Sequence, residues 1–157
     1  MTASVDLVIE DAEAMEALGA RVASVVRRGD VVMLNGELGA GKTTFTRGFG
    51  AALGARGAVT SPTFVLARTH PTEFGVPLVH VDAYRLGSAA EVDDLDLDFD
   101  GSITVVEWGA GKLDGAIDAW IEIDIVRPIG GDPEADDAPR HVCITAHGDR
   151  WHGIPLG

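Results

Sequence analysis

One stretch, GELGAGKT at positions 36–43, constrains the fold of this chain more than any other feature. It matches the pattern G-x-x-x-x-G-K-[ST] at every required position. An apolar run, VVML at 31–34, stands directly before it, and a helix is expected directly after it, from residue 43 to about residue 53. A strand, a glycine-rich loop and a helix in this order predict a loop that binds the phosphates of a nucleoside triphosphate.

Each residue type in the loop has a chemical task. Glycines let successive backbone N–H groups turn toward one phosphate. Lys42 supplies a compact cation for the β- and γ-phosphate oxygens, and Thr43 offers a hydroxyl to Mg²⁺. The following helix points its positive end at the anion. We therefore expect Mg-ATP to be bound by Gly36, Glu37, Leu38, Gly39, Ala40, Gly41, Lys42 and Thr43.

Hydrophobic periodicity gives the order of the other elements. Apolar residues spaced three and four apart predict an amphipathic helix over 11–28. Strands are expected at 31–34, 63–69, 76–82, 103–107, 121–126 and 141–146. We expect one α/β domain over residues 1–157, with a three-layer P-loop NTPase fold whose central sheet is mainly parallel and carries an antiparallel extension.

Two carboxylates stand at the ends of apolar strands: Asp82 closes LVHVD, and Glu107 closes ITVVE. In open α/β sheets, ligands bind at the carboxyl ends of the strands. A triphosphate site also needs an acid for the metal and a group that orients the nucleophile. We therefore expect Asp82 and Glu107 to act together with Lys42 in catalysis.

Two hydroxyl residues, Ser61 and Thr63, follow Lys42 by 19 and 21 positions and flank a proline. Nucleotide switches place a hydroxyl that senses the γ-phosphate in such a segment. On spacing alone, an ordinary proline turn fits equally well.

The charge balance excludes several classes of partner. The chain has 25 acidic and 12 basic residues, a net charge of −13 at pH 7. Such a chain repels nucleic acid and anionic membrane surfaces, so a role on nucleic acid would need a partner to make the contact. No segment approaches the ~18 apolar residues that cross a bilayer. With an acidic N-terminus and a single cysteine, Cys143, we expect a cytoplasmic protein.

The acidic stretch before Glu107 offers a competing interpretation. Asp96, Asp98, Asp100, Gly101 and Glu107 fit the calcium-loop pattern D-x-D-x-D-G-x5-E. A calcium loop needs its final glutamate to begin a helix, whereas the β-branched residues at 103–106 favour a strand that ends there. A solvated acidic face is the better interpretation of this stretch.

Other classes of nucleotide-binding protein have motifs that can be looked for in this sequence. A regulatory GTPase would need an N-K-x-D motif after the metal acid, but the only asparagine, Asn35, precedes the loop. A small-molecule kinase would need clustered arginines in a lid, and the arginines here are dispersed. It remains the alternative enzyme. A nucleotide-bound interaction module with nearly dormant hydrolysis also remains open.

Taken together, the motifs resemble the TsaE family, the P-loop ATPases of bacterial tRNA threonylcarbamoyladenosine biosynthesis. The matching stretches run in family order and spacing over most of the chain. They are GD at 29–30, GELGAGKTTF at 36–45, RG at 47–48, SPTF at 61–64, HVDAYRL at 80–86 and VEW at 106–108.

The resemblance implies a cytoplasmic ATPase that uses Mg²⁺ and works with the TsaD and TsaB proteins. Their complex transfers a threonylcarbamoyl group to adenosine 37 of tRNAs that read codons beginning with A. Such an ATPase would reach the tRNA only through its partners.

The resemblance also assigns roles by position. Lys42 and Thr44 would hold phosphates, Thr43 and Glu107 would hold Mg²⁺, and Asp82 would assist hydrolysis directly or through water. The switch-like loop would contain Ser61 and Thr63. Trp108 would pack by the nucleotide, face a partner or simply fill the core. Family members hold adenine in the regions where this chain has Asp11, Arg140 and His141.

Overall fold

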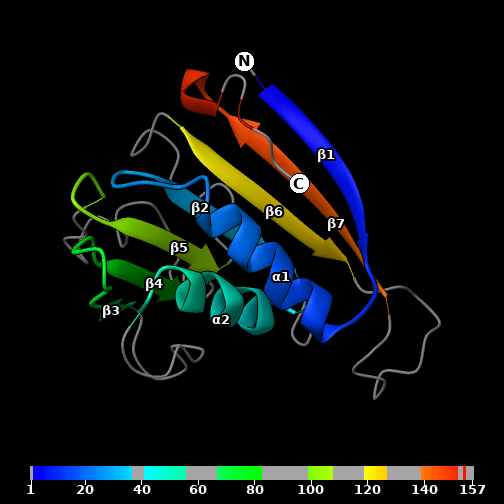
Figure 1. Ribbon diagram of the computed structural model, residues 1–157. Helices are drawn as coiled ribbons and strands as arrows, with labels where there is room; N and C mark the ends of the chain where they lie inside the picture. Colours follow the sequence, from blue (N-terminus) through cyan, green and yellow to red (C-terminus); the bar gives the residue numbers. More distant parts are fainter. Residues whose placement is uncertain are drawn as a thin grey trace.

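A computed structural model describes residues 2–36, 41–55, 67–82, 99–107, 119–126, 139–151 and 154 (Figure 1). The elements, in chain order, are β1 (Thr2–Ile9), α1 (Ala12–Ala23), β2 (Val31–Asn35), α2 (Lys42–Ala52), β3 (Ala67–His70), β4 (Leu78–Asp82), β5 (Ile103–Glu107), β6 (Trp120–Val126), β7 (Arg140–His147) and the short 3₁₀ helix η2 (Asp149–Trp151).

The seven strands within the described ranges form one mixed sheet in the order β1-β7-β6-β2-β5-β4-β3. The four central strands, β6, β2, β5 and β4, are parallel. At one edge β7 and β1 continue the sheet in antiparallel fashion, and at the other edge β3 does so. The predicted α/β class with a mainly parallel centre and an antiparallel extension is confirmed. Strand β1 is not among the predicted elements.

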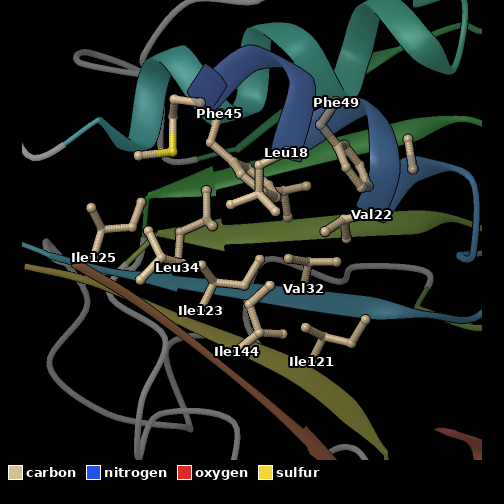
Figure 2. Packing of buried hydrophobic residues seen from close by; sticks show 14 of the residues in the cluster. Leu18, Val22, Val32, Leu34, Phe45, Phe49, Ile121, Ile123, Ile125 and Ile144 are labelled. Atoms are coloured by element: carbon tan, nitrogen blue, oxygen red, sulfur yellow. The ribbon is translucent and has the colours of Figure 1, made fainter. Parts of the chain in front are cut away.

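The two α-helices of the described part of the chain, α1 and α2, lie side by side on one face of the sheet (Figure 1). Figure 2 shows how their apolar side chains meet the strands. Leu18 and Val22 of α1 and Phe45 and Phe49 of α2 join one buried cluster with strand residues, among them Val32, Leu34, Ile121, Ile123 and Ile144. This packing fixes α2, whose first residue is Lys42, against the helix-covered face of the sheet.

The helices approach each other closely because α1 carries a glycine at the crossing. A Cβ atom at Gly19 would lie 2.3 Å from the Phe45 carbonyl oxygen and 2.8 Å from the Phe49 nitrogen. Real Cβ atoms do not come so near to backbone atoms, so a side chain at position 19 would push the helices apart.

A smaller buried cluster lies on the opposite face of the sheet. It contains Val31, Met33, Val79, Val81 and Val106, with Ala67, Phe99 and Trp120 packed against it. The third layer expected on this face is not among the described elements. None of the helices within the described ranges is long and apolar enough to cross a membrane.

The first helix is shorter than its apolar spacing predicts. It ends at Ala23, and Ser24 caps it with a backbone N–H that bonds to the Ala20 and Arg21 carbonyls, at 3.2 Å each. Val25 and Val26 continue the apolar spacing and pack against the core, but they do so from the connection to β2. The apolar spacing at Val25 and Val26 therefore indicates that these residues are packed against the core, but it does not indicate that they are helical.

Candidate functional site

Gly41 turns the chain from the glycine-rich loop into α2. Its φ is 121° and its ψ is 10°, a conformation that residues with a side chain rarely adopt. A Cβ atom there would also lie 3.1 Å from Met15 Cε. The Gly41 carbonyl accepts the first hydrogen bond of α2, from the Phe45 nitrogen at 2.9 Å. A glycine at this position therefore allows α2 to begin at Lys42.

Lys42, the first residue of α2, reaches back to Gly36. Its Nζ donates a hydrogen bond of 2.5 Å to the Gly36 carbonyl oxygen, and only 7% of the residue is exposed. The Lys42 carbonyl in turn accepts from the buried Thr46 Oγ1 at 2.8 Å. The ammonium is thereby held against the Gly36 carbonyl, near the positive end of the α2 dipole. The Lys42 ammonium and the positive end of the α2 dipole therefore lie together at the place where the sequence predicts that phosphate binds.

The remaining loop residues divide into two groups. Thr43 and Thr44 occupy the first turn of α2 and are partly buried. Backbone N–H groups in the first turn of a helix have no partner within the helix and are donors for an anion. Glu37, Leu38, Gly39 and Ala40 lie outside the described residues.

The two predicted carboxylate residues lie side by side at the carboxyl ends of their strands. Asp82 pairs in register with Glu107, and Glu107 pairs in register with Leu34 on its other side. Leu34 comes two residues before Gly36, where the loop begins. Glu107 lies two and four residues after Val105 and Ile103, which join the cluster under the helices, so its side chain lies on the same face, the one that α2 covers.

The donors at this edge suit Mg²⁺ better than a softer metal. Glu107 offers a carboxylate that is only 5% exposed, and Thr43 is a hydroxyl residue at the start of α2. Mg²⁺ takes oxygen ligands, commonly one or two carboxylates together with substrate phosphates. Within the described ranges, no group of three or more His, Cys, Asp or Glu side chains is arranged to hold a metal ion.

A buried histidine, His80, contacts Glu107, although no motif in the sequence predicts a role for its side chain. His80 Nε2 lies 3.0 Å from Glu107 Oε2, with side-chain exposures of 0% and 6%. His80 precedes Asp82 by two positions on β4 and is a polar residue within an apolar strand. That interruption is the signal that could have identified it.

A second polar pair at this edge was also not predicted. Asn35, the last residue of β2, donates from Nδ2 to Asp124 Oδ1 of β6 at 3.0 Å. The two residues are partners in the parallel register. This hydrogen bond ties the end of β2, from which the loop departs, to the neighbouring strand.

Three residues proposed to lie near adenine are placed at the same end of the sheet but not on one face. Asp11 caps α1, because its Oδ1 accepts from the Ala14 nitrogen at 2.8 Å. Arg140 is buried and pairs in register with Ile9. It lies two residues before Val142, which packs under the helices, and shares its face, whereas His141 is exposed and belongs to the opposite face. The structure therefore brings Asp11 and Arg140, but not His141, to the helix-covered side.

An open hollow of about 430 Å³ lies at the start of α1 and is lined by Glu10, Asp11, Ala12 and Glu13. Its acidic lining disfavours a phosphate there and suits a group that donates hydrogen bonds.

Other predicted residues cannot be assigned a place. Ser61, Thr63 and Trp108, and the acidic residues Asp96 and Asp98 of the calcium pattern, lie outside the described residues. Glu107 ends strand β5, where a calcium loop would require a helix to begin.

Comparison with known proteins gives one consistent family. The model of the family described as "Threonylcarbamoyl adenosine biosynthesis protein TsaE" matches residues 9–129. A tRNA threonylcarbamoyladenosine biosynthesis protein TsaE from Streptomyces coelicolor is 55% identical over 141 residues, which cover 87% of this chain and 93% of the relative. The protein of the same name from Bacillus subtilis is 36% identical over 140 residues, 88% of this chain and 84% of that relative. The crystal structure of Bacillus subtilis YdiB matches with a TM-score of 0.75 and 32% identity, covering 97% of this chain and 91% of that one.

Proposed function

The chain belongs to the TsaE family, and on that premise we propose that it is the ATP-binding and ATP-hydrolysing component of threonylcarbamoyladenosine biosynthesis on tRNA. Its relatives carry that biosynthesis in their names. The modified position is adenosine 37 of tRNAs that read codons beginning with A, and the protein acts in the cytoplasm with the TsaD and TsaB proteins.

The observation that carries the proposal is that Lys42 and Glu107 are both tied to the carboxyl end of β2. The Lys42 ammonium bonds to the Gly36 carbonyl, and Gly36 follows Leu34 by two residues. Leu34 is the register partner of Glu107. A cation and a carboxylate are therefore both held at the end of β2, and a triphosphate and its metal ion need these two groups close together.

Each group at this edge has a task that follows from its chemistry. Lys42 and the first turn of α2, including Thr44, bind the β- and γ-phosphates. Thr43 and Glu107 hold Mg²⁺, which neutralises charge on the phosphate oxygens when it is bound. Asp82, the neighbour of Glu107 in register, orients the attacking water directly or through a second water.

The net charge of −13 supports a division of labour within the complex. A surface this acidic repels the phosphates of tRNA, so the TsaD and TsaB proteins make the contact with tRNA. ATP hydrolysis by this chain then serves the complex and does not itself transfer the threonylcarbamoyl group.

The test is steady-state ATP turnover by the purified chain, alone and with the TsaD–TsaB pair, with Mg²⁺ and with EDTA. We expect slow turnover by the chain alone, stimulation by the pair, and loss of activity in EDTA. Absence of stimulation, together with transfer of phosphate to an added small molecule, would identify a kinase and overturn the proposal.

A further inference from the structure

His80 is more deeply buried than Glu107 or Lys42, the other described ionisable side chains of the proposed site. It is 0% exposed and lies in strand β4 two residues after Leu78, which joins the cluster under the helices, so His80 is on the same side of the sheet as α2. Its Nε2 lies 3.0 Å from Glu107 Oε2, and its Nδ1 is buried without a hydrogen-bond partner among the described residues. Its ring is therefore fixed on one side by Glu107 and surrounded by packed side chains.

We propose that His80 is a positioning residue, which holds the Glu107 carboxylate in the orientation that binds Mg²⁺. This inference rests on the proposed function, because it concerns the same metal site. His80 itself contacts neither the nucleotide nor the metal in this account.

The direction of the hydrogen bond follows from the groups involved. An ionised carboxylate only accepts hydrogen bonds, so Nε2 carries the hydrogen and donates it to Oε2. Hydrogen bonds to a carboxylate are shorter and stronger than neutral ones. Because both side chains are almost fully buried, water does not compete for Oε2. Glu107 is thereby restricted in the rotation that a solvent-exposed glutamate would have.

Stability alone does not explain a polar pair at this position. The neighbouring residues on this face, Leu78, Ile103 and Val105, belong to the apolar cluster under the helices. Apolar side chains that replace a buried polar pair often leave stability unchanged or increase it. Partners that orient a metal ligand, in contrast, typically affect metal affinity by about 10- to 100-fold.

The experiment compares His80→Phe, which keeps a ring without a donor, with His80→Gln, whose amide nitrogen can donate to Glu107. His70→Phe is the matched control. His70 is also buried, with an Nε2 atom that has no hydrogen-bond partner within the described ranges. It pairs with Leu78 at the other end of β4. The readouts are the affinity of a fluorescent ATP analogue in EDTA, the Mg²⁺ concentration that half-saturates its tighter binding, and the midpoint of thermal unfolding.

We expect His80→Phe to raise the half-saturating Mg²⁺ concentration by about 10-fold or more, with the affinity in EDTA unchanged. His80→Gln should have a half-saturating Mg²⁺ concentration close to that of the wild type, because its amide can still donate to Glu107. His70→Phe should behave as wild type. Should His80→Phe not fold, His80→Met takes its place under the same criteria.

Two results would overturn the inference while leaving the proposed function intact. One is a lowered unfolding midpoint in His80→Phe with an unchanged Mg²⁺ dependence, because the pair would then be structural only. The other is equal impairment of His80→Phe and His80→Gln, because the donor would then not matter. If the wild-type chain shows no Mg²⁺-dependent binding of the analogue, the proposed function itself fails, and the inference fails with it.

Discussion

The backbone of Glu16 in α1 lies directly against Gly48 in α2. A Cβ atom at Gly48 would be 2.1 Å from the Glu16 carbonyl oxygen and 2.7 Å from its Cα. Together with Gly19, this contact sets the distance between the helices, and the helix pair in turn seats the start of α2 over the sheet. The stability of the crossing therefore bears directly on the position of Lys42.

Gly48→Ala tests this contact, because helix propensity and the backbone clash predict changes of opposite sign in the free energy of unfolding. Intrinsic propensity predicts that alanine stabilises a helix by up to about 1 kcal/mol relative to glycine. The backbone clash predicts the reverse, a loss of about 1–3 kcal/mol in the free energy of unfolding. Chemical denaturation measures the difference. The control is Ala51→Gly, at an exposed position of the same helix, which should cost about 1 kcal/mol. A stabilised Gly48→Ala variant would show that the helices are not in contact there.

Much of the fold could be predicted because its signals are local. The apolar run before the loop, the loop itself and the helix after it each have their own pattern, and strands β5, β6 and β7 lie within a residue of the predicted bounds. Strand β1 was missed because its signal is weak: only Ile9 of its described side chains is buried, so its strand structure depends on pairing with β7. Such pairing joins distant parts of the chain and leaves no local pattern.

The connection between α1 and β2 is held by the C-terminal part of the chain. Asp30 is only 6% exposed. Its Oδ2 accepts from the Arg27 nitrogen at 2.7 Å and from Arg150 Nη2 at 3.0 Å. Arg150 Nη2 also donates to the Val25 carbonyl at 3.1 Å. Arg150→Met should therefore cost about 1–3 kcal/mol of stability, because a buried carboxylate loses a charged donor.

A double-mutant cycle with Asp30→Asn isolates this interaction. We expect a coupling energy of about 0.5–3 kcal/mol between positions 30 and 150, measured by urea denaturation. Arg68→Met, at an exposed position of β3, should change stability by no more than about 0.5 kcal/mol. Additive effects at positions 30 and 150 would mean that the ion pair contributes nothing.

The thiol of Cys143 should be less reactive than a free cysteine. Its hydrogen bond with Thr145 lowers its pKa, but desolvation and the carboxylates of Asp6 and Asp124 outweigh that effect and raise the pKa above its ordinary value. Since the thiolate is the reactive form, alkylation by iodoacetamide should reach its midpoint at a higher pH than for a free cysteine.

Asp6→Asn should shift this midpoint to lower pH, because it removes a negative charge that opposes formation of the thiolate. Glu10→Gln, which removes a carboxylate just beyond the end of β1, should leave the midpoint unchanged. If both variants behave alike, Asp6 is not the cause of the raised pKa.

The candidate site was predictable in its parts and less so in its connections. Lys42 stands in a motif, and Asp82 and Glu107 stand at strand ends, so their residue types and positions already point to one edge of a parallel sheet. The pairs His80–Glu107 and Asn35–Asp124 depend on which strands are neighbours and on their register. Both properties arise from pairing between segments far apart in the sequence.

The central claim, that Lys42 and Glu107 form the two sides of one Mg-ATP site, is tested most directly by comparing binding with turnover. ATP affinity and ATP hydrolysis are measured for Lys42→Ala, Glu107→Ala and the wild type in the presence of the TsaD–TsaB pair. Lys42→Ala should weaken ATP binding by about 10- to 100-fold or more, as expected for the loss of charged hydrogen bonds to phosphate. Glu107→Ala should lose Mg²⁺-dependent turnover more than it loses binding. Wild-type rates of ATP hydrolysis by both variants would contradict the account.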